Sequence, residues 1–100
     1  MAVPLLIIGA IALAGLTVVV MALLSWSYIV DWFQNRAAIK DEETVAFTLK
    51  QKLDSGNVKV IHGFFNTQAG KIVDGQQVEA EKLDREMEEV FGDEEIVVLG

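Results

Sequence analysis

Hydrophobic positions dominate the first 30 residues, and no charge interrupts them. No Asp, Glu, Lys, Arg or His occurs from Met1 through Val30, and the apolar run within this segment, Leu5 to Val30, is 26 residues long. As a helix rising 1.5 Å per residue, such a run would reach roughly 39 Å, more than the about 30 Å of bilayer hydrocarbon. The pattern therefore predicts a single-pass transmembrane helix with an aromatic interfacial end over residues 1–33.

A cleaved secretory signal is the alternative interpretation of this run. A signal peptide has a basic segment, a shorter apolar segment and a small-residue cleavage site. No Lys or Arg precedes the run here, and the one sequence that resembles a cleavage site, Ala12-Leu13-Ala14, falls in the middle of it. We therefore expect the segment to be retained.

The flanks of the run predict an orientation, because Lys and Arg near a span are held on the cytoplasmic side. Basic residues occur only on the C-terminal flank, so the N-terminus is expected outside and the rest of the chain in the cytoplasm. Aromatic rings gather just before these charges, as is typical of the headgroup region. The expected membrane-interface anchors are Trp26, Tyr28, Trp32, Phe33, Arg36 and Lys40.

Charge divides the chain into two parts. Residues 1–40 carry a net charge of +1 and residues 41–100 a net charge of −8. We read residues 34–40 as a juxtamembrane stem and residues 41–100 as a small acidic domain. Because such a surface is repelled by phosphates, nucleic acid is not expected as a partner, and a basic patch on a protein is favoured.

The pattern of residues 41–100 predicts an α+β domain in the order α-β-β-α-β. A helix is expected over 41–54, a hairpin of strands at 58–65 and 71–78, a helix over 80–91 and a strand over 96–99. A right-handed crossover would give a three-stranded antiparallel sheet of order 2-1-3. Residues 34–40 contain no helix breaker, so the stem could also continue the span as one rod; the sequence leaves both open.

Small residues mark one surface of the predicted span. Such residues let helices approach closely in membranes, although glycine and alanine are also common there without any packing role. The surface would accept other integral membrane subunits or a second copy of the chain, with lipid covering the rest. The helix-packing candidates are Gly9, Ala10, Ala14 and Gly15.

Residues able to perform catalysis or bind metals are few. Cysteine is absent, and His62 is the only histidine. One histidine in a predicted strand, with no second imidazole or thiolate, is more typical of a sheet interior than of a metal or catalytic site. An acidic cluster could hold a cation, but its spacing does not match a calcium loop and a solvated surface is the simpler interpretation. We therefore expect no enzyme, metal or cofactor. The cluster comprises Glu86, Glu88, Glu89, Asp93, Glu94 and Glu95.

Phe64 and Phe65 point to opposite faces of the predicted central strand. One of them needs cover beyond a single helix, so both are candidates for a docking surface. Together with the span, this favours a non-catalytic accessory or assembly subunit of a larger integral membrane complex. The alternative is a membrane-tethered adaptor whose acidic domain recruits a soluble basic partner.

Overall fold

A five-stranded mixed sheet organises the whole chain. The structure, a computed structural model, describes the backbone of residues 3–99 and the side chains of that range apart from 3–5 and 12–14. The strand order is β1-β4-β3-β2-β5, with β1 parallel to β4 and the remaining neighbours antiparallel. The elements are α1 Val3–Ala14, β1 Thr17–Leu24, α2 Trp26–Gln34, the 3-10 turn η1 Ala37–Ile39, β2 Thr44–Lys52, β3 Val58–Asn66, β4 Lys71–Leu83, α3 Arg85–Phe91 and β5 Ile96–Val98.

The apolar N-terminal run is divided among three elements. The helix α1 ends before Gly15, whose φ of +59° lies in the left-handed region that favours glycine. The following TVVV sequence at 17–20 is β-branched and enters the sheet as β1, and α2 then begins after its cap, Ser25. No helix in residues 3–99 has both the length and the apolar character needed to cross a bilayer.

The prediction of a single-pass membrane protein, with its N-terminus outside and its C-terminal domain cytoplasmic, is therefore wrong. The physical reason is that apolar content alone does not distinguish a lipid-facing helix from the shorter helices and strands of a small fold. Here β4 offers a strand with which residues 17–24 pair in parallel, from Thr17 beside Gln76 to Leu24 beside Leu83.

The predicted three-stranded antiparallel sheet is also wrong. Residues 41–54, expected to be a helix, contain β2, which pairs with β3 so that Thr48 lies opposite His62. The strand β4 extends to Leu83, so residues 80–83, expected to begin the second helix, are in a strand. What remains of that helix is α3, capped by the Asp84 side chain, which accepts a hydrogen bond from the Met87 N–H.

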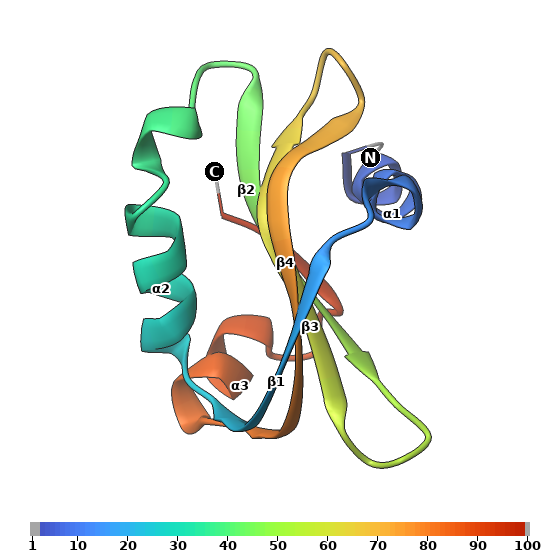
Figure 1. Ribbon diagram of the computed structural model, residues 1–100, viewed down its shortest axis with the longest axis vertical. Helices are drawn as coiled ribbons and strands as arrows, with labels where there is room; N and C mark the ends of the chain where they lie inside the picture. Colours follow the sequence, from blue (N-terminus) through green and yellow to red (C-terminus); the bar gives the residue numbers. More distant parts are fainter. Residues whose placement is uncertain (1–2, 100) are drawn as a thin grey trace.

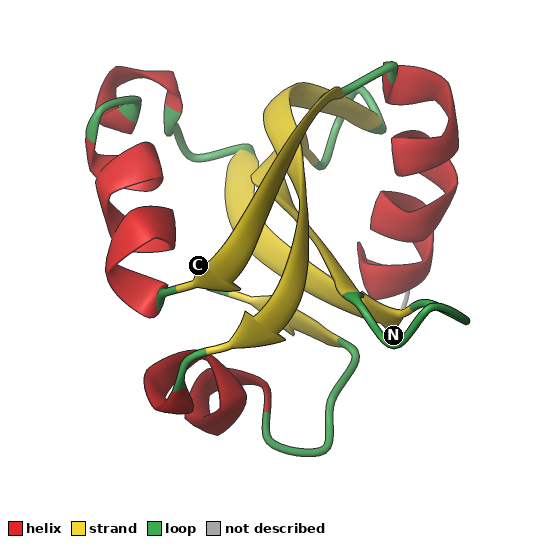
Figure 2. Cartoon of the chain, turned by 60° about the horizontal axis from the view of Figure 1, so that its bottom comes forward, coloured by secondary structure: helices red, strands yellow, loops and turns green. Residues whose placement is uncertain are grey.

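Helices cover both faces of the sheet (Figures 1 and 2). On one face, α1 places Ile7 and Ala10 against Phe47, Ile61 and Phe65. On the other face, α2 and α3 pack over Val60, Val78 and their neighbours, and the end of α2 covers Phe64. This two-sided cover explains why β3 is buried along most of its length.

Candidate functional site

A row of polar side chains crosses the sheet beneath α2. Thr48 on β2, His62 on β3 and Gln76 on β4 are direct cross-strand neighbours. Thr48 and His62 are both fully buried. Neither ring nitrogen of His62 nor the Thr48 hydroxyl has a hydrogen-bond partner among the described residues. Such unsatisfied buried groups are costly, so this row is the most unusual polar feature of the interior.

Aromatic rings enclose His62. The ring centroid of Trp32 lies 4.8 Å from that of the imidazole, and those of Phe33 and Tyr28 lie at 6.0 and 6.4 Å. The Tyr28 hydroxyl donates to Gln76 Oε1 at 3.1 Å and closes the row toward β4. All three aromatic residues come from one helix, α2, so the position of that helix fixes the surroundings of His62.

The chemistry of His62 follows from this enclosure. Burial is the main cause that lowers the pKa of His62 from 6.5 to about 4; the neighbouring Gln76 side chain opposes this shift, and the positive charge of Arg36 adds to it. The imidazole is therefore neutral at pH 7 and has no access to solvent. A buried neutral ring with no reacting partner is suited to structure and to sensing acid, and not to general base catalysis.

The residues expected as membrane-interface anchors have other partners here. Trp32 is buried against Phe64, and Arg36 stacks on the Trp32 ring at 4.2 Å from its centroid. The Arg36 Nε donates to Asp74 Oδ2 at 3.0 Å, and the Lys40 ammonium donates to the Thr44 carbonyl at 2.8 Å. Trp26 and Tyr28 pack beside the core under α2. These residues therefore attach α2 and the following turn to the sheet.

Phe64 and Phe65, the candidates for a docking surface, are 2% and 0% exposed. Phe64 stacks against Trp32 with centroids 5.9 Å apart, and Phe65 packs under α1. The cover for both rings comes from segments that the sequence analysis assigned to the membrane. These two side chains consequently offer no exposed surface in this structure.

The small residues expected to pack spans lie in or beside α1. Ala10 is 8% exposed and packs on the sheet, whereas Gly9 is on the exposed side with open space where a Cβ would lie. Gly15 ends the helix. The side chain of Ala14 is outside the described residues. Small residues here allow α1 to lie on the sheet, a role the spacing alone does not distinguish from packing between spans.

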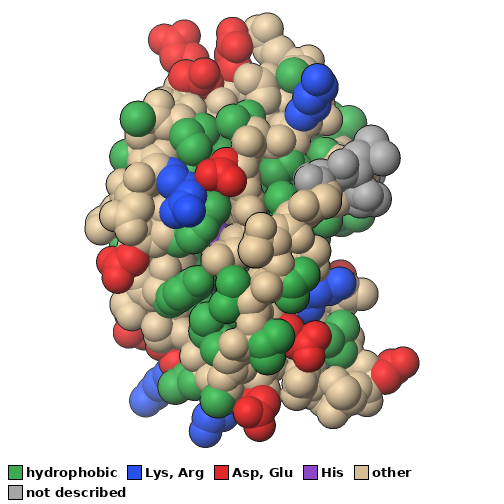
Figure 3. Space-filling model, viewed as in Figure 1, with side chains coloured by type: hydrophobic (Ala, Val, Ile, Leu, Met, Phe, Trp, Pro, Cys, Tyr) green, Lys and Arg blue, Asp and Glu red, His purple; other side chains and the backbone are tan. Residues whose placement is uncertain are grey.

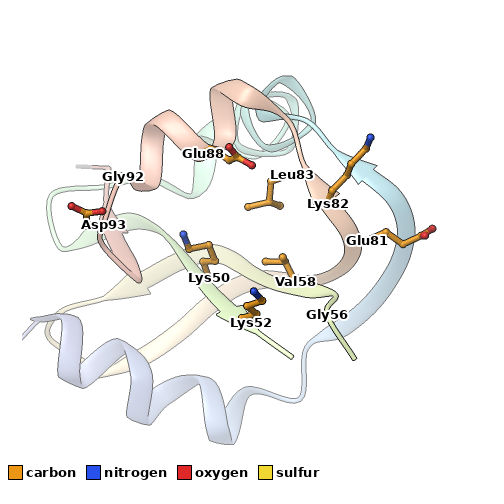
Figure 4. A pocket seen from close by; sticks show the side chains of 10 residues that line it. All are labelled: Lys50, Lys52, Gly56, Val58, Glu81, Lys82, Leu83, Glu88, Gly92 and Asp93. Atoms are coloured by element: carbon orange, nitrogen blue, oxygen red, sulfur yellow. The ribbon is translucent and has the colours of Figure 1, made fainter. Parts of the chain in front are cut away.

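A charged cleft lies between α3 and the sheet (Figure 4). It has a volume of about 640 Å³ and is lined by both lysine and acidic residues, among them Lys50, Lys82 and Glu88. Lys50 also lies over the Phe91 ring, 5.2 Å from its centroid. Within the described residues, no three His, Cys, Asp or Glu side chains converge as a metal site would require, so the acidic cluster at 86–95 does not form one.

The sheet has two unlike edges. The edge strand β5 is three residues long and directly follows Asp93, Glu94 and Glu95. The edge strand β1 is eight residues long and carries no charge and no proline. Short, charged edges resist pairing with other chains, whereas long uncharged ones invite it. The two edges therefore differ in the property that controls strand addition.

Hydrophobic side chains on β1 are open to solvent. Val20 is 73% exposed, Val18 57% and Leu23 48%. In the view of Figure 3, hydrophobic side chains reach the surface in the lower half of the face, where β1 runs in Figure 1. This surface was not expected from the sequence, although a signal was present: the β-branched run at 17–20 begins two residues after Gly15.

Comparisons with protein-family models, with curated proteins and with solved structures find no match to this chain.

Proposed function

We propose that this chain is a non-catalytic assembly domain that joins a larger protein assembly by adding a strand at the β1 edge. The observation that carries the proposal is the eight-residue uncharged edge with Val18, Val20 and Leu23 exposed. In strand addition, backbone hydrogen bonds supply affinity and alternate side chains supply specificity. This proposal keeps the accessory or assembly role expected from the sequence and discards the membrane span.

The surroundings of His62 and Lys50 support a non-catalytic role. The one histidine is buried in an aromatic enclosure with a lowered pKa, and the Lys50 side chain in the charged cleft is engaged with a ring. Neither arrangement brings together a nucleophile, a base and an orienting group, which an enzyme site requires. An exposed apolar edge, in contrast, needs nothing further to bind a strand.

A photo-crosslinking residue tests the proposal. The crosslinker replaces Val20 in the full chain inside the producing cell, and a matched variant carries it at Val73, an exposed valine on β4 that is 51% exposed. We expect protein adducts from position 20 at several times the yield from position 73. Equal yields at both positions, or no protein adduct at position 20, would contradict the assignment.

A second candidate function is recruitment of a basic protein partner, the role of the adaptor in the sequence analysis without its tether. The supporting observation is that the acidic side chains at 86, 88, 89 and 93–95, on α3 and in the segment that leads to β5, are all exposed. Binding of this kind would weaken steeply with salt, whereas strand addition through uncharged residues would not. Measuring the yield of photo-adducts at low and high salt separates the two functions.

A further inference from the structure

We infer that the strand added at the β1 edge is β1 of a second copy of this chain, paired antiparallel about a two-fold axis at Val20. The inference rests on the proposed function and names its partner. It would join two five-stranded sheets into one continuous sheet. An antiparallel pair of identical strands satisfies both open edges in a single closed contact, as two-fold interfaces do.

One hydrogen bond between β1 and the residue after β4 shows which backbone N–H and C=O groups of β1 point to the open side. The Asp84 N–H donates to the Leu24 carbonyl at 3.0 Å, so the backbone groups of Leu24 point toward β4. Because successive residues of a strand point their N–H and C=O groups to opposite sides, those of residues 18, 20 and 22 also point inward. The groups of residues 17, 19, 21 and 23 point to the open side.

These free groups select the register. A two-fold axis perpendicular to the sheet pairs residues whose side chains lie on the same face of the sheet. An even-numbered residue can therefore lie opposite only an even-numbered residue of the second copy, and an odd-numbered residue opposite only an odd-numbered one. Centring on Val20 pairs Thr17 with Leu23 of the second copy and Val19 with Met21, which uses all four outward residues. Centring on Met21 would instead set Thr17 opposite Ser25, which lies outside β1 and caps α2.

The register also places the exposed side chains against each other. Val20, the most exposed of the large hydrophobic residues described, meets Val20 of the second copy in a non-hydrogen-bonded pair. Such pairs bring the Cα atoms to about 4.5 Å, the closest approach in an antiparallel sheet. Val18 lies beside Ala22 of the second copy on the same face. The contact therefore covers the apolar side chains that are otherwise in water.

Charge favours this edge for contact between two copies of an acidic chain. The chain carries a net charge of −7, so most approaches between copies bring like charges together. At the β1 edge the nearest acidic row is Glu79, which pairs with Val20 one strand inward. Three strand spacings of about 4.8 Å separate the two Glu79 rows, more than the Debye length of about 8 Å at physiological salt. The β5 edge has only three strand residues, and the acidic residues 93–95 directly precede them.

The absence of cysteine from the sequence makes a disulfide test specific. Val20→Cys places one thiol on the axis, within the range of Cα separations that a disulfide allows. After mild oxidation of the purified full chain, we expect a covalent dimer as the main product by intact mass. The matched Val73→Cys variant is expected to form it at least tenfold more slowly. Equal rates would overturn the inference.

A second measurement needs no oxidation. Sedimentation of the unmodified chain is expected to show a concentration-dependent dimer, and Val20→Lys is expected to weaken it at least tenfold, since edge lysines block strand pairing. Circular dichroism checks that the variant is folded. A photo-adduct at position 20 with a different protein, without a Val20→Cys dimer, would overturn self-pairing and leave the assembly function standing. If neither the photo-adduct at position 20 nor the Val20→Cys dimer forms, both the assembly function and the self-pairing are overturned.

Discussion

The imidazole of His62 lies edge-on to the indole of Trp32, with ring centroids 4.8 Å apart and ring planes at 81°. This contact joins the centre of β3 to α2, two segments that the charge pattern had assigned to different compartments. It also removes the only histidine from water. The stability of the fold should therefore depend on pH through this one ring.

We expect the free energy of unfolding to fall as the pH drops from 6.5 toward 4. The unfolded chain binds a proton at His62 near pH 6.5, whereas burial lowers the pKa in the folded chain to about 4. Stability is thus fully present above pH 6.5 and is lost through this window, by up to about 3 kcal/mol at 1.36 kcal/mol per pKa unit.

Chemical denaturation at a series of pH values measures this dependence. The His62→Leu variant, which has no titrating ring, serves as the control because all carboxylates are common to both chains. The difference in unfolding free energy between the two chains should change across pH 4 to 6.5. A difference that stays constant would show that the ring is solvated or already protonated in the folded chain.

Gly63 is expected to tolerate no side chain. A Cβ at this position would contact the Asp74 carbonyl oxygen and lie 2.8 Å from the Gly75 Cα, both backbone atoms of β4. Because the two strands would have to separate, Gly63→Ala should cost at least about 2 kcal/mol in thermal or chemical unfolding.

Gly9 provides the matched control for that substitution. It lies in the helix α1 and has open space at the position of a Cβ. Gly9→Ala should therefore stabilise the chain by up to about 1 kcal/mol through helix propensity. Destabilisation of both variants to the same degree would contradict the close approach of β3 and β4.

Asp84 joins the beginnings of two helices. Its carboxylate accepts from the Met87 N–H at 2.8 Å, which caps α3, and from the Trp26 N–H at 3.3 Å at the start of α2. Asp84→Ala should cost about 1–2 kcal/mol, the range for loss of a helix cap, whereas Asp84→Asn, which retains an accepting oxygen, should cost less. Equal costs in thermal unfolding would mean that the bonds are not made in solution.

Arg36 offers a weaker prediction. Its bond to Asp74 is partly exposed, with side chains 37% and 41% accessible, so water and salt screen the pair. Asp74→Asn should cost no more than about 1 kcal/mol, and the cost should shrink in 1 M salt, as for exposed ion pairs. Arg36→Ala should cost more, because it also removes the stacking on Trp32. A salt-independent cost for Asp74→Asn would contradict the exposed geometry.

Local signals in the sequence determined part of this fold. A β-branched and aromatic stretch with a glycine-containing turn predicted the hairpin, and the structure has β3 and β4 there, antiparallel. The pattern also predicted a helix over 80–91, and its last turns are α3. The buried position expected for His62 rested on its isolation from other ligands, and the ring is fully buried. The deciding interactions of the hairpin and of the helix lie within a few neighbouring residues, whereas the burial of His62 also needs the rings of α2.

Only the tertiary structure decided which secondary structure residues 5–30 and 41–54 adopt. A continuous apolar run suits both a lipid-facing helix and the shorter helices and strands of a small fold, and the choice depends on whether a partner strand such as β4 is in reach. Val45, Ala46 and Leu49 fit a helical face as well as a strand buried on both sides, so pairing of β2 with β3 settles their conformation. The open β1 edge arises from strand order, which residues far apart in the sequence fix together. The sequence by itself therefore determined composition, charge and local turns, and long-range pairing determined which surface is left free.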